Sequence, residues 1–288
     1  MSTHIRGLLL ALLACLAGSP ALAQVFVPDV VNEEGTQFVR EAPPTAQPNP
    51  PAPRPTVPAA AAAARPPQPA LPPEPYPTVV LLVDTSDSML NEIPGRGRTR
   101  LDEAMEALRG VEQDMKPETR LQLWSFNSIL SPHPLEGGEG GGGEGSSQGF
   151  VTLGKKNSPV RANFRARLKG LRTAAGTNLY MAVVKTLDIF NNPADVPLYK
   201  SGERFPVLVV VSDGEDWGQS PYTLAAVEAA RRKVPWVTIH IIGFYVSPND
   251  PQYAALCKIA THPEGCAAAE NPQQLAAILA SFYRPPKK

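Results

Sequence analysis

The stretch Val79–Leu90, VVLLVDTSDSML, runs from a hydrophobic segment directly into a polar one. Its first five residues are all valine or leucine, and such a short apolar run is typical of a strand covered on both faces. Asp84, Ser86 and Ser88 then follow at alternate positions. Where a strand turns into a loop, side chains at alternate positions are free to converge. Their carboxylate and hydroxyl oxygens are hard donors, which suit Mg²⁺, Mn²⁺ or Ca²⁺ rather than zinc.

Downstream of this stretch, short apolar runs alternate with helical patterns. Such an alternation indicates a doubly wound α/β fold, in which helices flank a mostly parallel central sheet. Ligands of such folds bind at the carboxyl ends of the strands. We expect strands at 78–83, 120–126, within RFPVLVVVSDG (204–214), at 236–244 and at 266–269. We expect helices at 100–113, 160–171, 179–190, 221–232, 254–260 and 272–283, the last capped by Asn271.

Two further segments place oxygen-bearing side chains at the ends of expected elements. TAAGTNLY puts Thr177 just before a helix, and VVVSDGED puts Asp213 at the end of the most apolar strand. With Asp84, Ser86 and Ser88 they make a set of two carboxylates and three hydroxyls. Each of these residues taken alone could simply cap a helix or form a turn. The interpretation as a metal site therefore depends on all five occurring together.

The pattern resembles the von Willebrand factor A (VWA) domain and its metal-ion-dependent adhesion site, in an exported bacterial type. The matching motifs are DTSDS at 84–88, GTN at 176–178 and SDG at 212–214, and they occur in the family's order. The resemblance covers roughly residues 78–283, so it implies a VWA domain at 78–285 with a Rossmann-like fold.

The resemblance also implies a role for each of the five residues. Ser86, Ser88 and Thr177 would ligate a divalent cation through their hydroxyls, and Asp84 and Asp213 would approach it directly or through water. Neutral hydroxyl ligands leave the charge of the cation poorly compensated. It therefore attracts one more anionic oxygen, which in this family typically comes from a Glu or Asp of a protein partner.

A glycine-rich acidic segment lies between the second expected strand and the helix after it. We expect residues 131–156, which include LEGGEGGGGEGSSQG, to form a flexible loop insertion at the surface of the domain.

The amino-terminal part of the chain predicts export. Residues 1–23 read as a signal peptide, with Arg6 before the apolar GLLLALLACLAG and a small-residue cleavage site, ALA, at 21–23. A second interpretation is lipidation at Cys15. We expect no transmembrane span, because the apolar run of this leader is too short and no other segment approaches 18 apolar residues. The expected location is the periplasm or the outside of the cell.

Residues 24–77 have the composition of a disordered spacer. Fifteen of the 35 residues from Pro43 to Pro77 are proline, and nine of the other twenty are alanine. Such a segment lacks backbone donors and large apolar side chains, so we expect an extended polyproline-like chain rather than packed structure.

Two cysteines remain after the expected leader, Cys257 and Cys266. An even pair in an oxidising compartment indicates a disulfide, although two independent buried thiols are the alternative.

The charge balance narrows the class of partner. The chain has 27 Lys and Arg against 27 Asp and Glu, so there is no global positive field that would favour nucleic acid.

The leading interpretation is a binding module that captures an acidic group of a protein partner, in adhesion or in assembly of an envelope complex. The alternatives are a metal-independent envelope scaffold and a metal-dependent hydrolase. We do not expect an enzyme, because no histidine has a clear role as a general base and a two-metal centre would need more carboxylates.

Overall fold

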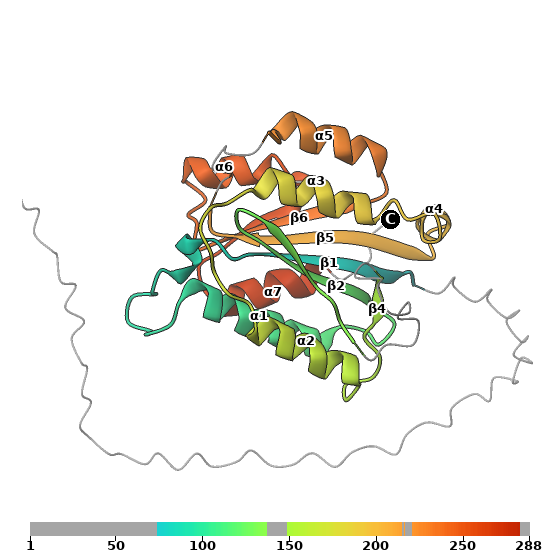
Figure 1. Ribbon diagram of the computed structural model, residues 1–288, viewed down its shortest axis with the longest axis horizontal. Helices are drawn as coiled ribbons and strands as arrows, with labels where there is room; N and C mark the ends of the chain where they lie inside the picture. The colour runs from blue at the N-terminus through green and yellow to red at the C-terminus, as the bar shows by residue number, and fades with distance from the viewer. Residues whose placement is uncertain (1–73, 137–148, 215, 217–220, 283–288) are drawn as a thin grey trace, which may run out of the picture. The chain divides into compact units, whose positions relative to one another are not determined.

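The computed structural model describes residues 74–136, 149–214, 216 and 221–282 (Figure 1). All the described residues belong to one compact unit within Gln68–Lys288. The expected signal peptide, Cys15 and most of the expected spacer therefore lie outside the described residues.

One seven-stranded sheet forms the centre of the domain, in the order β3-β2-β1-β5-β6-β7, with β4 also paired to β2. The pairs β1–β2, β1–β5, β5–β6 and β6–β7 are parallel, whereas β3 and β4 run antiparallel to β2. The strands are β1 (Tyr76–Asp84), β2 (Arg120–Phe126), β3 (Leu130–His133), β4 (Val151–Thr152), β5 (Arg204–Ser212), β6 (Thr238–Phe244) and β7 (Cys266–Ala269).

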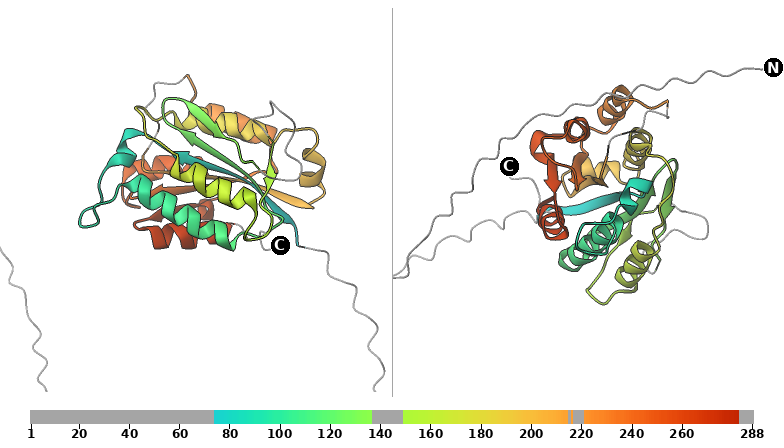
Figure 2. Two further views of the ribbon diagram at one scale, coloured as in Figure 1. Left: turned by 60° about the horizontal axis from the view of Figure 1, so that its bottom comes forward. Right: turned by 90° about the vertical axis from the view of Figure 1, so that its left-hand side faces the viewer.

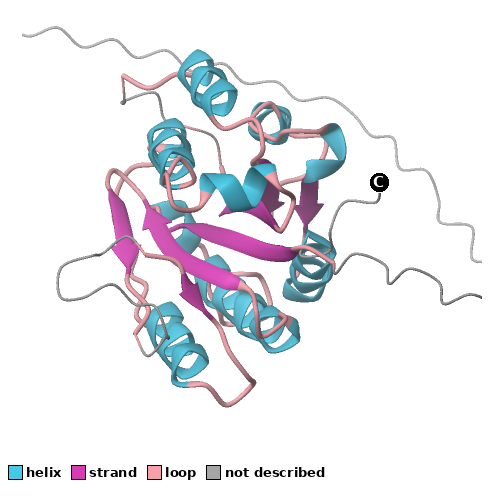
Figure 3. Ribbon diagram, turned by 90° about the vertical axis from the view of Figure 1, so that its right-hand side faces the viewer, coloured by secondary structure: helices cyan, strands magenta, loops and turns pink. Residues whose placement is uncertain are grey.

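Helices cover both faces of this sheet (Figures 1 and 2). Helices α1, α2 and α7 lie against one face, and α3, α5 and α6 lie against the other, with the strands between them in Figure 3. The helices are α1 (Arg100–Asp114), α2 (Pro159–Lys169), α3 (Leu179–Ile189), α4 (Val196–Lys200), α5 (Leu224–Lys233), α6 (Pro251–Cys257) and α7 (Pro272–Phe282), with 3-10 turns η1 (Asp87–Leu90) and η2 (Pro263–Gly265). The expected doubly wound, mostly parallel α/β fold is confirmed.

The central strand β1 shows why its sequence is a continuous apolar run. Val79, Leu81 and Val83 pack into the core on the side of α1, α2 and α7. Val80 and Leu82 pack into the second core, on the side of α3 and α5. All five side chains are fully buried, because a strand in the middle of a two-faced sheet has no exposed side.

The loop expected at 131–156 is shorter in the structure, because strands occupy both of its ends. Residues 130–133 form β3 and residues 151–152 form β4, and both strands extend the sheet beyond β2. Leu135, Phe150 and Leu153 are buried, because these apolar side chains continue the core past the edge of the glycine-rich run. Residues 137–148 lie outside the described residues.

Most other boundaries shift by a few residues. The first strand begins at Tyr76 rather than at residue 78, and the helix expected at 221–232 begins at Leu224, because the hydroxyl of Thr223 accepts from the backbone N–H of Ala226 and caps it. Helix α4 was not expected. The Asn271 cap of α7 is confirmed, since its Oδ1 accepts from the N–H of Gln274 at 2.9 Å.

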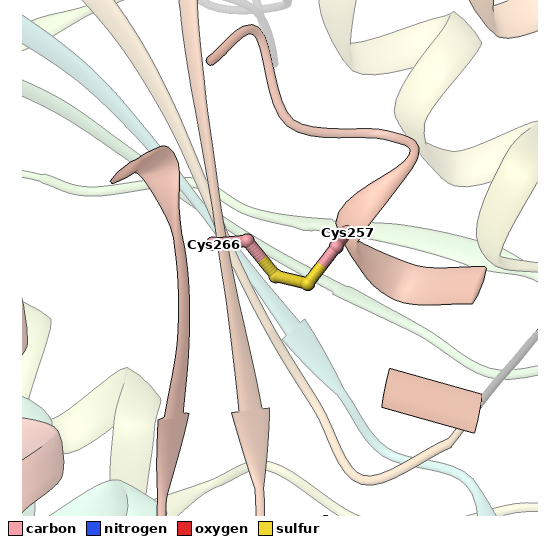
Figure 4. The surroundings of a disulfide bond; sticks show 2 residues. All are labelled: Cys257 and Cys266. Carbon is pink, nitrogen blue, oxygen red and sulfur yellow. A yellow bond between two sulfur atoms is a disulfide. The ribbon is translucent and has the colours of Figure 1, made fainter. Parts of the chain in front are cut away.

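A disulfide joins Cys257 and Cys266, as the sequence indicated (Figure 4). It links the last residue of α6 to the first residue of β7 and closes the loop that carries η2. Among the described residues, no helix is both long enough and apolar enough to span a bilayer.

Candidate metal-binding site

Parallel pairing brings the ends of β1 and β5 to the same edge of the sheet. Asp84 is the last residue of β1, and Asp213 directly follows the last residue of β5. Both side chains are buried, and the turn after β1 then places Ser86 and Ser88 beside them. The two serine hydroxyls lie 2.9 Å apart, and the Ser88 hydroxyl donates to Asp213 Oδ1 at 2.7 Å. The structure thus brings together four of the five expected site residues.

Asp84 is a buried carboxylate held only by neutral donors. The backbone N–H of Ser86 donates to its Oδ1 at 2.8 Å, and the Ser212 hydroxyl donates to its Oδ2 at 2.5 Å. Burial raises the pKa of Asp84 to about 6, although these hydrogen bonds favour the ionised form. No described Lys, Arg or His forms an ion pair with it. The negative charge of Asp84 is therefore uncompensated within the described part of the chain.

The fifth expected residue, Thr177, lies on a neighbouring loop. The backbone N–H of Ala174 donates to Thr85 O at 2.9 Å, and that of Asn178 donates to Asn127 O at 2.8 Å, so the loop is tied to the ends of β1 and β2. Gly176 has φ of +87°, a left-handed conformation that favours glycine. Thr177 is buried, but no hydrogen bond between described residues links its hydroxyl to the other four.

Two acidic residues near the motifs have separate positions. Asp87 is exposed. The Oδ2 of Asp216 accepts from the backbone N–H of Tyr180 at 2.8 Å, so it ties the segment after β5 to the first turn of α3. Its neighbour Glu215 lies outside the described residues.

Sequence reasoning missed two residues that contact the site. Ser212 belongs to the SDG motif but was given no role, and its hydroxyl bonds to Asp84. Arg100, the first residue of α1, forms an ion pair with Asp213, with Nη1 2.7 Å from Oδ2. The sequence offers no signal for this pair, because Arg100 is one of three arginines in GRGRTR and lies 113 residues from Asp213.

The donor set fits a hard divalent cation and does not fit zinc. Among the described residues there is no group of three or more His, Cys, Asp or Glu side chains placed to hold a metal. The cluster instead combines the carboxylates of Asp84 and Asp213 with serine hydroxyls. Each carboxylate oxygen has two lone pairs, so those that already accept one hydrogen bond retain capacity for a ligand bond. Oxygen-only sets of this kind suit Mg²⁺, Mn²⁺ or Ca²⁺.

The fold also creates a serine–histidine pair away from this cluster. Ser125 Oγ and His133 Nε2 lie 2.8 Å apart on the paired strands β2 and β3. Ser125 is buried, and no described carboxylate bonds to the ring of His133. Burial lowers the pKa of His133. A hydroxyl that a substrate cannot reach, beside a histidine without an orienting acid, is a cross-strand contact rather than a nucleophile.

Comparisons by sequence find no matching family model and no matching curated protein. Comparison of structures finds clear similarities. The vWF domain of the type V pili tip protein Mfa5 from Porphyromonas gingivalis has a TM-score of 0.52 and 13% identity, over 74% of this chain and 95% of the other. A von Willebrand factor type A protein from Catenulispora acidiphila has a TM-score of 0.51 and 16% identity, over 73% of this chain and 42% of the other. The domain has the von Willebrand factor A fold.

A third solved structure is also similar to this chain. The pilus adhesin SpaC from Lactobacillus rhamnosus GG has a TM-score of 0.50 and 17% identity, over 73% of this chain and 30% of the other. This chain therefore spans less than half of the length of two of the three proteins. At such identities the shared property is the VWA fold itself.

Proposed function

We propose that this chain is an exported binding module that holds a divalent cation at the edge of its VWA fold and captures an acidic group of a protein partner. The observation that carries the proposal is the cluster of Asp84, Ser86, Ser88 and Asp213. The backbone N–H of Ser86 donates to Asp84, the two serine hydroxyls are hydrogen-bonded to each other, and the Ser88 hydroxyl donates to Asp213. The uncompensated charge of Asp84 supports it further, because a buried anion without a cationic partner is costly.

The residues that would hold the cation are Ser86, Ser88 and Thr177 through their hydroxyls, with Asp84 and Asp213 as the charged members. When bound, the cation supplies a positive charge that attracts an anionic oxygen. The protein's part is to fix the donors in advance. The parallel pairing of β1 with β5 positions both carboxylates, and Ser212 holds Asp84 at the end of β1.

Adhesion, or assembly of an envelope complex, is the setting we propose for this module. Two of the structures with the same fold are a pilus tip protein and a pilus adhesin. The signal sequence and the proline-rich spacer support export and a domain that reaches away from its attachment. On this proposal the chain is not an enzyme, and its partner presents a Glu or Asp side chain. A metal-independent scaffold on the same fold is the main alternative.

The first test is direct cation binding by the whole chain. We expect calorimetric titration with Mg²⁺ and with Mn²⁺ to show one site, and the double variant Ser86→Ala/Ser88→Ala to bind at least about tenfold more weakly. Ser201→Ala is the matched control, because Ser201 follows α4, ahead of the opposite end of β5, and should bind like the wild type. A double variant that binds like the wild type would exclude this site.

The second test addresses the partner. The chain is used as bait in an envelope extract, with millimolar Mg²⁺, with EDTA, and as the Asp84→Ala variant. A partner retained only by the wild type in Mg²⁺ supports metal-bridged recognition. A partner retained in all three conditions supports the metal-independent scaffold instead.

A further inference from the structure

Arg100 places a fixed positive charge against the candidate metal site. Its guanidinium Nη1 lies 2.7 Å from Asp213 Oδ2, while the other oxygen of that carboxylate accepts from Ser88. The Asp213 side chain is fully buried, whereas 26% of the Arg100 side chain is exposed. The ion pair is therefore screened by water on one side only. The positive charge of Arg100 would therefore interact strongly with a cation bound to the same Asp213 carboxylate.

The position of Arg100 is defined by its surroundings. Thr99 caps α1 in a reciprocal pair with Asp102, which fixes the backbone at the first residue of the helix. The guanidinium also lies 5.9 Å from the centre of the Tyr245 ring, within reach of a cation–π interaction.

Tyr245 is itself held in place by a second group of charges. Its hydroxyl donates to Glu103 Oε2 at 3.2 Å, and Arg96 forms an ion pair with the same carboxylate at 3.0 Å. The Glu103 side chain is only 3% exposed. The guanidinium of Arg100 thus contacts both the Asp213 carboxylate and an aromatic ring that is hydrogen-bonded to Glu103 of α1.

A guanidinium and a divalent cation compete for Asp213. Each is attracted to the carboxylate, and each repels the other when both are close to it. We propose that Arg100 is the resident counterion of Asp213 and sets the cation affinity of this chain, weakening it relative to the same oxygens without the arginine. The inference rests on the proposed function and adds to it a residue that controls how readily the site fills.

The test is calorimetric titration of the full chain with Mn²⁺, comparing the wild type with Arg100→Gln and Arg100→Lys. Removing the charge should tighten Mn²⁺ binding by about tenfold or more, because the repulsion is lost. Arg100→Lys keeps the charge and should stay close to the wild type. Arg98→Gln is the matched control: it removes the same charge two residues away, where Arg98 pairs with Glu106 rather than with the site. We expect it to change affinity by less than about twofold.

A thermal measurement provides a second readout. Arg100→Gln leaves Asp213 buried without its cation, so the variant should melt at a lower temperature than the wild type in EDTA. Its gain in melting temperature on adding Mn²⁺ should exceed that of the wild type.

The outcomes separate this inference from the proposed function. If the wild type binds Mn²⁺ and Arg100→Gln binds it no more tightly, the role of Arg100 is wrong and the metal site stands. If neither protein binds, the proposed metal site is wrong and the inference fails with it. Binding by Arg100→Gln alone would support the inference.

Discussion

Burial of Asp84 makes its ionised form costly to the folded domain. Burial raises its pKa from 3.8 to about 6, a difference that corresponds to ~3 kcal/mol of stability. The pKa of Asp84 is higher in the folded protein than in the unfolded chain. The stabilisation by the protonated carboxyl is therefore fully present below about pH 3.8 and is lost as the pH rises through about 6. At pH 7.5 and without metal, ionised Asp84 therefore destabilises the domain.

Asp84→Asn should remove that penalty, because asparagine is neutral, has the same shape, and retains an oxygen that accepts from the N–H of Ser86. In EDTA at pH 7.5 we expect the variant to be up to ~3 kcal/mol more stable, or to melt roughly 6–12 °C higher, measured by urea and thermal unfolding. Adding Mg²⁺ should stabilise the wild type and leave the variant unchanged.

The control for this prediction is Asp87→Asn, three residues away. Asp87 is exposed, so its replacement should change stability by less than about 0.5 kcal/mol. Repeating the comparison at pH 4 should shrink the advantage of Asp84→Asn, since the wild-type carboxyl is then mostly protonated in the folded state. A variant that is less stable than the wild type in EDTA at pH 7.5 would refute the reasoning. It would show that the hydrogen bonds from Ser86 and Ser212 outweigh the cost of burying the charge.

Two further predictions address other parts of the domain. Burial lowers the pKa of His240 to about 4, so its contribution to stability is present above about pH 6.5 and is lost as the pH falls through about 4. Compared with His240→Phe, the wild type should lose ~2–3 kcal/mol across that window in urea unfolding; equal pH profiles would contradict this. Reduction of the Cys257–Cys266 disulfide should cost ~2–3 kcal/mol of unfolding free energy, because the bond closes a short loop. A Cys257→Ser/Cys266→Ser variant should match the reduced protein and should not respond to reductant.

The elements with the clearest local patterns were predictable from the sequence. The apolar runs of β1 and β5 specify strands buried on both faces, and Cys266–Ala269 was placed with its correct bounds. Strands β3 and β4 flank the acidic glycine-rich run and were not predicted. Such short strands have no clear hydrophobic pattern in the sequence, and both form by pairing with β2.

Helix α2 shows a different limit of sequence reasoning. Its repeated arginines indicate a solvated basic face, yet the Arg161 side chain is 1% exposed and forms a 2.8 Å ion pair with Glu112 of α1. Glu112 is equally buried. A charged residue enters the interior only when a partner from another element meets it there, and a single sequence does not name that partner.

The amino-acid sequence by itself determined the class of fold, and it singled out strand-end residues as the candidate site. Periodicity and strand-end composition are local properties, so they can be read along the chain. The tertiary structure decided which charges meet at the site. Only the parallel register of β1 and β5 brings Asp84 to the same edge as Asp213, and only the packing of α1 against that edge brings Arg100 to Asp213. Electrostatic interactions depend on distance in space and on burial, which residues 113 positions apart acquire only when the chain folds.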